Sequence, residues 1–564
     1  MLHTRPLPSS SSSGRFGEIL QSVTGLLAPE CTITFLPSVD GSGRGAAIVT
    51  AVALRLAEQR REVDRVLSPL RLSHSDLQRV QALMRQEMDL GLGKDTNARS
   101  SVRMLPTYVR ATPDGTERGE FLALDLGGTN FRVLVVHAAE GSVRVASEIY
   151  LIPTRILQGT GVAVRLRICA QGEGEGVGIA SPLTAHGPGM GLGEPLRHHP
   201  SLGPADHGSS PQLFNYIIEC IMDCQLKHNL MEQILPLGFT FSFPCQQLGL
   251  DKAVLLNWTK GFNASGCVGQ DVVQLLRDAA QRKEVRSTAA LRGLPSPYHH
   301  LSPCGMAARC QAALQGHSGG GDTSTGSPGT GTNACYMEEM RNVGTVEGDD
   351  GRMCINMEWG AFGDNGCLDH IITTFDRMVD EKTINPGKQR FEKLISGMYL
   401  GEIVRYILLA MVEKQVLFRG KPCPKLQTKD IFQTKFLSTI EIDGLALRKV
   451  LAILRDLDLH ASFEDSVLVR EVCQTVSLRA AQLCAAGMAA VVEKMRENRG
   501  LEQLVVTVGV DGTLYKMHPH FSQNLQQTLQ VLAPKCTVTF LHSDDGSGKG
   551  AALVAAVACR KAGP

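Results

Sequence analysis

The chain has 564 residues, of which 43% are apolar, so it is long enough for two or more domains with separate hydrophobic cores. Its 57 lysines and arginines nearly balance 56 aspartates and glutamates, which argues against a nucleic acid or an acidic membrane as a partner. The longest apolar runs fall far short of the roughly 18 residues that a transmembrane helix needs. We therefore expect a folded, multi-lobed protein with no transmembrane segment, in which local groups hold any anionic ligand.

The 16 cysteines are scattered, with no CxxC pair and no Cys/His spacing typical of a metal site. The start of the chain shows no secretory signal, so reduced thiols in the cytosol are favoured over a disulfide framework. The sequence predicts a soluble cytoplasmic protein without a metal held by thiolates. Peripheral membrane association stays open.

A repeat marks the two ends of the chain. APECTITFLPSVDGSGRGAAIVTAVALR (residues 28–55) recurs without gaps as APKCTVTFLHSDDGSGKGAALVAAVACR (residues 533–560). We interpret residues 16–57 as the end of a preceding domain copy, after a disordered N-terminus over residues 1–15. Residues 58–90, within the segment 58–100, have apolar residues at helical spacing, with Ser75 suited to cap a helix start. They are predicted as a connecting helix, although an ordinary surface helix of the next domain is an alternative.

Residues 101–561 are predicted to form one complete copy with two subdomains, 101–283 and 284–561. Short β-rich runs alternate with long amphipathic helices, which is typical of an α/β protein. Two stretches break this pattern. Residues 162–210 are rich in Gly, Pro and His without periodicity and are expected to be a disordered loop, and residues 285–328 contain no plausible buried strand.

Several glycine-rich turns have the residues of a phosphate site. In FLALDLGGTNFRVLVV, Asp125 ends an apolar strand, and a Gly-Gly turn leads into a second strand. Glycines let backbone N–H groups approach phosphate oxygens, and the carboxylate can orient hydrated Mg²⁺. A plain β-hairpin is the alternative for this motif alone. VGVDGTLYK, GTGTNACYME and DDGSGKGAAL supply similar turns, and their number in one chain favours nucleotide binding.

The motifs DLGGTN, LGFTFSFPC, LNWTKGF, GTGTNACYMEE, INMEWGAFGD, NPGKQRFEKLISGMYLGEIVR and VGVDGTLYKMHPHF occur in this order. Together they resemble the hexokinase family, over nearly all of residues 101–561 apart from the two unpatterned stretches. The partial leading repeat resembles the tandem-duplicated mammalian members, most closely the type III form. The resemblance implies a two-lobed, actin-like (ribonuclease H-like) ATPase fold that closes over ATP and a hexose between a small and a large subdomain.

The resemblance also implies which residues bind the ligands. The sugar contacts implied in this way are Ser242, Phe243, Thr259, Lys260, Asn333, Glu358 and Glu392. Carboxylates accept bonds from sugar hydroxyls, whereas Asn, Ser and Thr can donate or accept. The residues implied at the phosphates and adenosine are Asp125, Leu126, Gly127, Gly128, Thr129, Asn130, Thr330, Gly397, Thr434, Lys435, Phe436, Leu437, Ser438, Asp511, Gly512, Thr513, Leu514, Tyr515, Lys516 and Met517. Mg²⁺ would arrive with ATP rather than bind the protein directly.

The family's reaction is ATP-dependent phosphorylation of glucose, mannose or fructose at the 6-hydroxyl, the first step of glycolysis, which yields glucose 6-phosphate from glucose. Its catalytic base is an Asp in an Asn-Asp-Thr motif, which this sequence lacks; residues 285–328 stand in its place. Asp322 lies there among glycines, with no strand to position it as a base. We therefore expect weak or absent turnover.

The sequence leaves three interpretations open. The first is a working hexokinase that accommodates this stretch, and the second is a catalytically impaired protein that still binds sugar or nucleotide. A chaperone-like ATPase on the same fold is a third alternative, against which WTKG, MEWG and RFEK argue because hydrolysis alone needs no sugar pocket. Hexose preference and oligomeric state do not follow from the sequence.

Overall fold

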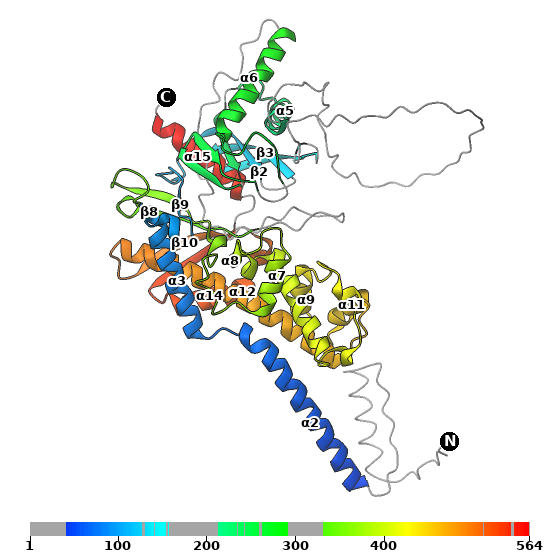
Figure 1. Ribbon diagram of the computed structural model, residues 1–564. Helices are drawn as coiled ribbons and strands as arrows, with labels where there is room; N and C mark the ends of the chain where they lie inside the picture. The colour runs from blue at the N-terminus through cyan, green and yellow to red at the C-terminus, as the bar shows by residue number, and fades with distance from the viewer. Residues whose placement is uncertain are drawn as a thin grey trace, which may run out of the picture.

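The computed structural model describes residues 41–126, 130–139, 142–153, 156, 212–233, 235–241, 243–258, 262–290, 331–510, 512–542 and 546–562. These residues form two lobes and one long projecting helix (Figure 1). The expectations for residues 1–40 and 162–210, and for most of residues 285–328, lie outside the described residues. Residues 285–290 are helical.

The first lobe is built on a four-stranded sheet of order β4-β3-β2-β5, in which β2 pairs with β3 antiparallel and with β5 parallel. Its strands are β2 (Gly119–Leu126), β3 (Asn130–Ala139), β4 (Ser142–Leu151) and β5 (Leu237–Phe241). Its helices are α5 (Gln212–Lys227), α6 (Val272–Ala290) and α15 (Gly546–Ala562). A small hairpin, β6 (Cys245–Gly249) and β7 (Lys252–Leu255), follows β5. The two strands predicted on either side of the Gly-Gly turn are confirmed as the antiparallel pair β2 and β3, and the turn itself, residues 127–129, lies outside the described residues.

Alternation along β2 builds a separate core on each face of this sheet. Leu122 and Leu124 belong to the cluster that contains α5 and α6, whereas Phe121 and Ala123 belong to the cluster that contains α15. Successive side chains of a strand point to opposite faces, so an almost fully apolar strand indicates burial on both. The predicted subdomain boundary needs correction, because α15 packs on this first lobe although it was assigned to residues 284–561, and α6 crosses the boundary.

Gly238 lets α15 approach the sheet closely. A Cβ atom added to this residue of β5 would lie 2.3 Å from the carbonyl oxygen of Ala551 in α15. We predict that Gly238→Ala lowers the free energy of unfolding by about 1–3 kcal/mol, since the backbone of α15 would have to shift. Urea unfolding measures this. Gly550→Ala is the matched control on α15, because its added Cβ would meet no atom within 4 Å; equal stability loss in both variants would contradict the packing argument.

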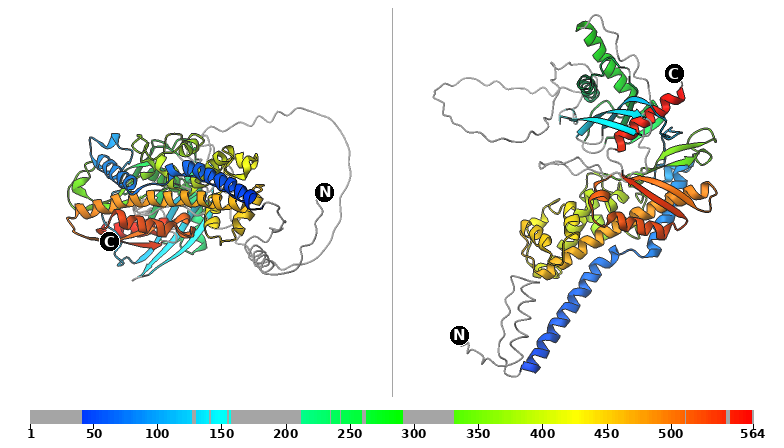
Figure 2. Two further views of the ribbon diagram at one scale, coloured as in Figure 1. Left: turned by 90° about the horizontal axis from the view of Figure 1, so that it is seen from below. Right: turned by 180° about the vertical axis from the view of Figure 1, so that it is seen from behind.

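The second lobe surrounds α12, the long helix that runs through it in orange (Figure 2). Its other helices are α3 (His74–Leu92), α7 (Thr374–Glu381), α8 (Arg390–Ile395), α9 (Gly397–Glu413), α10 (Thr434–Glu441), α11 (Arg448–Asp456), α12 itself (Phe463–Asn498), α13 (Thr513–Met517) and α14 (Phe521–Leu532). Its strands are β1 (Leu105–Pro106), β8 (Cys335–Glu339), β9 (Arg352–Asn356), β10 (Leu504–Val510) and β11 (Cys536–His542).

The strands of the second lobe form two small sheets. One has the order β1-β9-β8 and is antiparallel, and the other pairs β10 with β11 in parallel. Among the described residues, α12 alone is long and apolar enough to cross a membrane, but 89% of its most apolar window is buried inside the protein. This burial is typical of a core helix.

The connecting segment is not one helix. α2 (Gly41–Leu67) already contains the end of the predicted remnant, a short 3₁₀ turn with Pro69 follows, and α3 begins only after Ser73. The capping residue is Ser73, not Ser75, because Asp76 lies three positions after Ser73 and completes a reciprocal capping box. α3 packs on α12 within the second lobe, and the last turns of α2 also join its core through Val63, Val66 and Leu67, whereas the earlier part of α2 extends away from it (Figure 1).

Candidate active site

Three polar side chains meet where β8 begins and β9 ends. The amide nitrogen of Asn333 donates to the side-chain oxygen of Asn356 at 2.7 Å and to Oε1 of Glu358 at 3.0 Å. Asn356 donates to the same Oε1, also at 3.0 Å. Glu358 has φ 51° and ψ 46°, a left-handed conformation that is costly for a residue with a Cβ. The ends of two neighbouring strands therefore hold one carboxylate in a defined place.

Glu392 is held beside this group by α8. Its Oε2 accepts a hydrogen bond from the backbone N–H of Thr332 at 2.9 Å. Gly331 is needed here, because a Cβ added to it would lie 2.1 Å from Oε2 of Glu392. The start of α8 is held by Asp364, which accepts from the backbone N–H groups of Gln389 and Arg390. The two predicted carboxylates thus converge on the GTGTN loop.

The surroundings of these carboxylates disfavour further negative charge. Burial, with the charge of Glu358 adding to it, raises the pKa of Cys245 to about 12. Burial likewise raises the pKa of Tyr399, and the charge of Glu392 adds to that shift. Burial also raises the pKa of Asp364, although its two backbone hydrogen bonds oppose this.

On the first lobe, Phe243 has a supporting role. Its side chain is buried and its ring lies 4.8 Å from that of Trp258 and 4.7 Å from that of Phe262, centroid to centroid. These rings flank the loop that contains Thr259 and Lys260. Ser242, Thr259 and Lys260 themselves lie outside the described residues. The side chain of Phe243 therefore packs against Trp258 and Phe262, and its burial leaves little of it exposed to a ligand.

On the phosphate side, Asp125 is the penultimate residue of β2 and lies directly opposite Arg132 of β3. Arg132 donates to Oδ2 of Asp125, whereas Oδ1 is buried and has no hydrogen-bond partner among the described residues. A buried carboxylate oxygen of this kind suits a ligand that brings its own donors, such as the water shell of a magnesium ion. Gly127, Gly128, Thr129, Thr330 and the side chain of Asn130 lie outside the description.

The residues predicted around adenosine do come together. A Cβ added to Gly397 would lie 3.9 Å from Cγ2 of Thr434 and 4.0 Å from Cβ of Leu514. Thr434 donates to the carbonyl of Gly397 and accepts from Gly401, which ties α10 to α9.

Within this set the structure separates exposed from buried side chains. Lys435, Thr513, Lys516 and Met517 are exposed, and Phe436, Ser438 and Gly512 are partly buried. Leu437 and Tyr515 are buried in the core, so they support this surface and cannot contact a ligand in this conformation. Leu126 is likewise buried in the core of the first lobe, and Asp511 lies outside the description.

Sequence reasoning missed three residues of the site. Asn356 bridges Asn333 and Glu358. Gln389 starts α8 in a left-handed conformation, and a Cβ on Gly360 would lie 2.3 Å from its side-chain oxygen. Trp359 donates to the hydroxyl of Thr332 at 3.2 Å. The only signal in the sequence was their position next to residues already identified.

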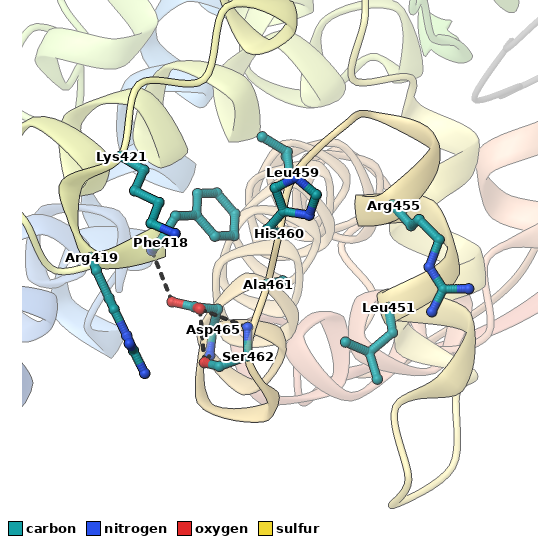
Figure 3. A pocket seen from close by; sticks show the side chains of 10 residues that line it. All are labelled: Phe418, Arg419, Lys421, Leu451, Arg455, Leu459, His460, Ala461, Ser462 and Asp465. Carbon is teal, nitrogen blue, oxygen red and sulfur yellow. Dashed lines mark hydrogen bonds between the residues drawn. The ribbon is translucent and has the colours of Figure 1, made fainter. Parts of the chain in front are cut away.

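A cavity of about 340 Å³ lies elsewhere in the second lobe (Figure 3), at the start of α12. It is lined by Arg419, Lys421, Arg455 and His460, among others. At its floor the carboxylate of Asp465 already accepts hydrogen bonds from Phe418 and Ser462. None of the residues predicted for sugar or nucleotide lines it, so it is separate from the candidate site.

Two family models match the chain, both described as hexokinase. One matches residues 62–167 and 202–292, and the other matches residues 328–557. The interruptions at 168–201 and 293–327 fall within the two stretches that lack a folded pattern in the sequence.

Relatives and solved structures agree with these models. The chain is 55% identical to hexokinase-3 of Rattus norvegicus over 547 residues and to that of Homo sapiens over 549. It is 51% identical to hexokinase-2 of Rattus norvegicus. In these pairs 97% of this chain is matched, but it spans about half the length of each relative, 52% or 53%.

Among solved structures, a Schistosoma mansoni hexokinase complexed with glucose has a TM-score of 0.66 and 33% identity, covering 89% of this chain and 99% of that one. A second hexokinase crystal structure has a TM-score of 0.63 and 27% identity, covering 89% of this chain and 100% of that one. The predicted two-lobed α/β hexokinase fold is thereby confirmed. The chain belongs to the hexokinase family.

Proposed function

We propose that this chain binds a hexose and ATP–Mg²⁺ where its two lobes meet, as an ATP:hexose 6-phosphotransferase, and that its turnover is weak or absent as the sequence stands. The observation that carries the proposal is the convergence of Asn333, Glu358 and Glu392, joined by Asn356, on one small region. An ATPase that acts on water or on protein has no need of this hydroxyl-binding set, which disfavours the chaperone-like alternative.

The roles of the residues follow from their hydrogen-bonding capacity. Glu358 and Glu392 each have carboxylate lone pairs to accept bonds from sugar hydroxyls, and such charge-assisted bonds are about twice as strong as neutral ones. Oδ1 of Asp125, which is buried without a hydrogen-bond partner among the described residues, would accept hydrogen bonds from water bound near the phosphates. ATP–Mg²⁺, when bound, supplies the phosphoryl group and neutralises its charge. The protein's part is to align the 6-hydroxyl with that group and exclude water.

The weak turnover follows from the missing base. The family's Asn-Asp-Thr motif is absent, and residues 285–328 occupy its place in the sequence. Loss of a general base typically reduces the rate by ~10²–10⁴. Binding does not need that base, so we expect sugar affinity to persist where turnover fails. Substrates of the family, glucose first among them, are the ligands to test.

The test measures glucose binding by isothermal titration and glucose 6-phosphate formation by a coupled assay. Both are performed on the chain as it stands and on a version with the Asn-Asp-Thr strand restored in place of residues 285–328. Binding in both and turnover only in the restored version would support the proposal. Turnover by the unaltered chain would refute the claim of impairment, and absence of glucose binding in both would refute the function itself.

A further inference from the structure

Oε1 of Glu358 accepts hydrogen bonds from the side-chain amides of Asn333 and Asn356. The other hydrogen bonds of these two amides fix their orientation. The side-chain oxygen of Asn333 accepts from the backbone N–H of Ala334 at 2.8 Å. An amide whose oxygen is engaged by a backbone donor must point its nitrogen the opposite way. The nitrogen of Asn333 therefore faces Asn356 and Glu358.

The same reasoning applies to the next amide. The oxygen of Asn356 receives the nitrogen of Asn333 at 2.7 Å, so the nitrogen of Asn356 must face Glu358, where it donates at 3.0 Å. The orientation passes from the backbone at Ala334 through two amides to a single carboxylate oxygen. Neither amide can flip alone without placing two donors or two acceptors together.

The carboxylate that receives these bonds is in a backbone conformation that needs support. Glu358 has a left-handed backbone conformation, which is unfavourable for a residue with a side chain. Its backbone neighbour Met357 is held by both Ala334 and Met104. Both amides bind Oε1, and no described residue donates to Oε2. Asn333 is buried, whereas Asn356 and Glu358 are partly exposed.

We infer that Asn356 is a positioning residue for hexose recognition: its amide holds Oε1 of Glu358, so that Oε2 is presented to a sugar hydroxyl. This inference rests on the proposed sugar-binding function but concerns a residue outside the predicted contacts. Asn356 acts through Glu358 and need not touch the sugar.

The test is a double-mutant cycle with Asn356→Ala, Glu358→Ala and the double variant. Glucose binding is followed by tryptophan emission, because Trp359 follows Glu358 and Trp258, the chain's only other tryptophan, precedes Thr259. We expect Asn356→Ala to weaken glucose binding about tenfold, or ~1.4 kcal/mol, and to have no further effect once Glu358 is Ala. Equal loss in both backgrounds would overturn the inference, since a general packing role does not depend on Glu358.

A second arm separates this inference from the proposed function. Without sugar, the same four proteins give a coupling free energy for unfolding, and residues joined by a hydrogen bond should show a double-variant loss that differs from the sum of the two single losses. If the free energies of unfolding show no coupling between Asn356 and Glu358, the positioning of Glu358 by Asn356 is refuted, even if the chain binds glucose. Conversely, the variants could show coupling while the unaltered chain binds no glucose. The hydrogen bond between Asn356 and Glu358 would then stand, but its role in sugar recognition and the proposed function would both be refuted.

The isosteric variant Asn356→Asp sharpens the result. It keeps the size of the side chain but replaces a donor by a second carboxylate next to Glu358, which is repulsive. Glucose binding should therefore be weaker than in Asn356→Ala. Binding equal to that of the unaltered chain would overturn the inference, because size alone would then suffice.

Discussion

Arg479→Met is expected to lower the free energy of unfolding by about 3–5 kcal/mol, which is the usual cost of removing one partner from a buried ion pair. Arg479 lies on α12 and is 1% exposed, and its guanidinium donates to both oxygens of Asp376 at 2.9 and 2.6 Å. Asp376 also completes the capping box of α7 with Thr373. Methionine would leave a buried carboxylate without its counter-charge. Urea unfolding followed by circular dichroism measures the loss.

Arg60→Met is the matched control, since Arg60 pairs with Asp64 and Glu471 at the surface and its side chain is 50% exposed. An exposed pair contributes at most about 1 kcal/mol. A loss of similar size in both variants would contradict the assignment of a structural role to the buried pair.

The same ion pair predicts a dependence on pH. Burial by itself would raise the pKa of Asp376, but the charge and hydrogen bonds of Arg479 hold it below its ordinary value. A depressed folded-state pKa gives stability that is present above the unfolded value of about 4 and is lost as pH falls through the folded value. The stability gap between the unaltered chain and Arg479→Met should therefore shrink in acid. A gap that widens there would refute this assignment.

Glu392→Gln should weaken glucose binding by about 100-fold, the largest effect expected at the sugar site. The carboxylate of Glu392 already accepts the N–H of Thr332. A glutamine would have to keep its oxygen on that donor and turn its nitrogen, which cannot accept, toward the sugar. A bond to a charged group contributes about 1.5–3 kcal/mol. Isothermal titration with glucose measures the change.

Glu381→Gln is the control for this prediction, as it makes the same chemical change at an exposed position at the end of α7. Its affinity for glucose should equal that of the unaltered chain. If Glu392→Gln also bound glucose normally, Glu392 would be excluded from the sugar site, and the proposed function would rest on Asn333 and Glu358.

Several elements could be predicted because their signals are local. The apolar run on each side of the Gly-Gly turn predicted the β2–β3 pair, and glycines before an Ala-rich stretch predicted α15. The cap of α3 was predicted two residues too late, since Ser73 and Ser75 have similar propensity. Asp76 decides between them, because a capping box requires the acceptor at the third helical position.

The partners of these elements depended on tertiary contacts. α15 was assigned to the second subdomain from its place in the chain, but it covers the sheet of the first lobe, where Gly238 allows close approach. Asn356 lies at the end of a strand with nothing periodic to distinguish it, and its role appears only when Asn333 and Glu358 meet it in space.

The sequence by itself determined the family, the strands and turns that contain the phosphate motifs, and the residue types able to bind a sugar, because ordered motifs and apolar periodicity are properties of neighbouring residues. Only the tertiary structure decided which carboxylate oxygens are engaged, which predicted side chains are buried in the core, and which lobe each helix covers. Those outcomes depend on packing and hydrogen bonds between residues that lie far apart in the chain, which a pattern among neighbouring residues does not indicate.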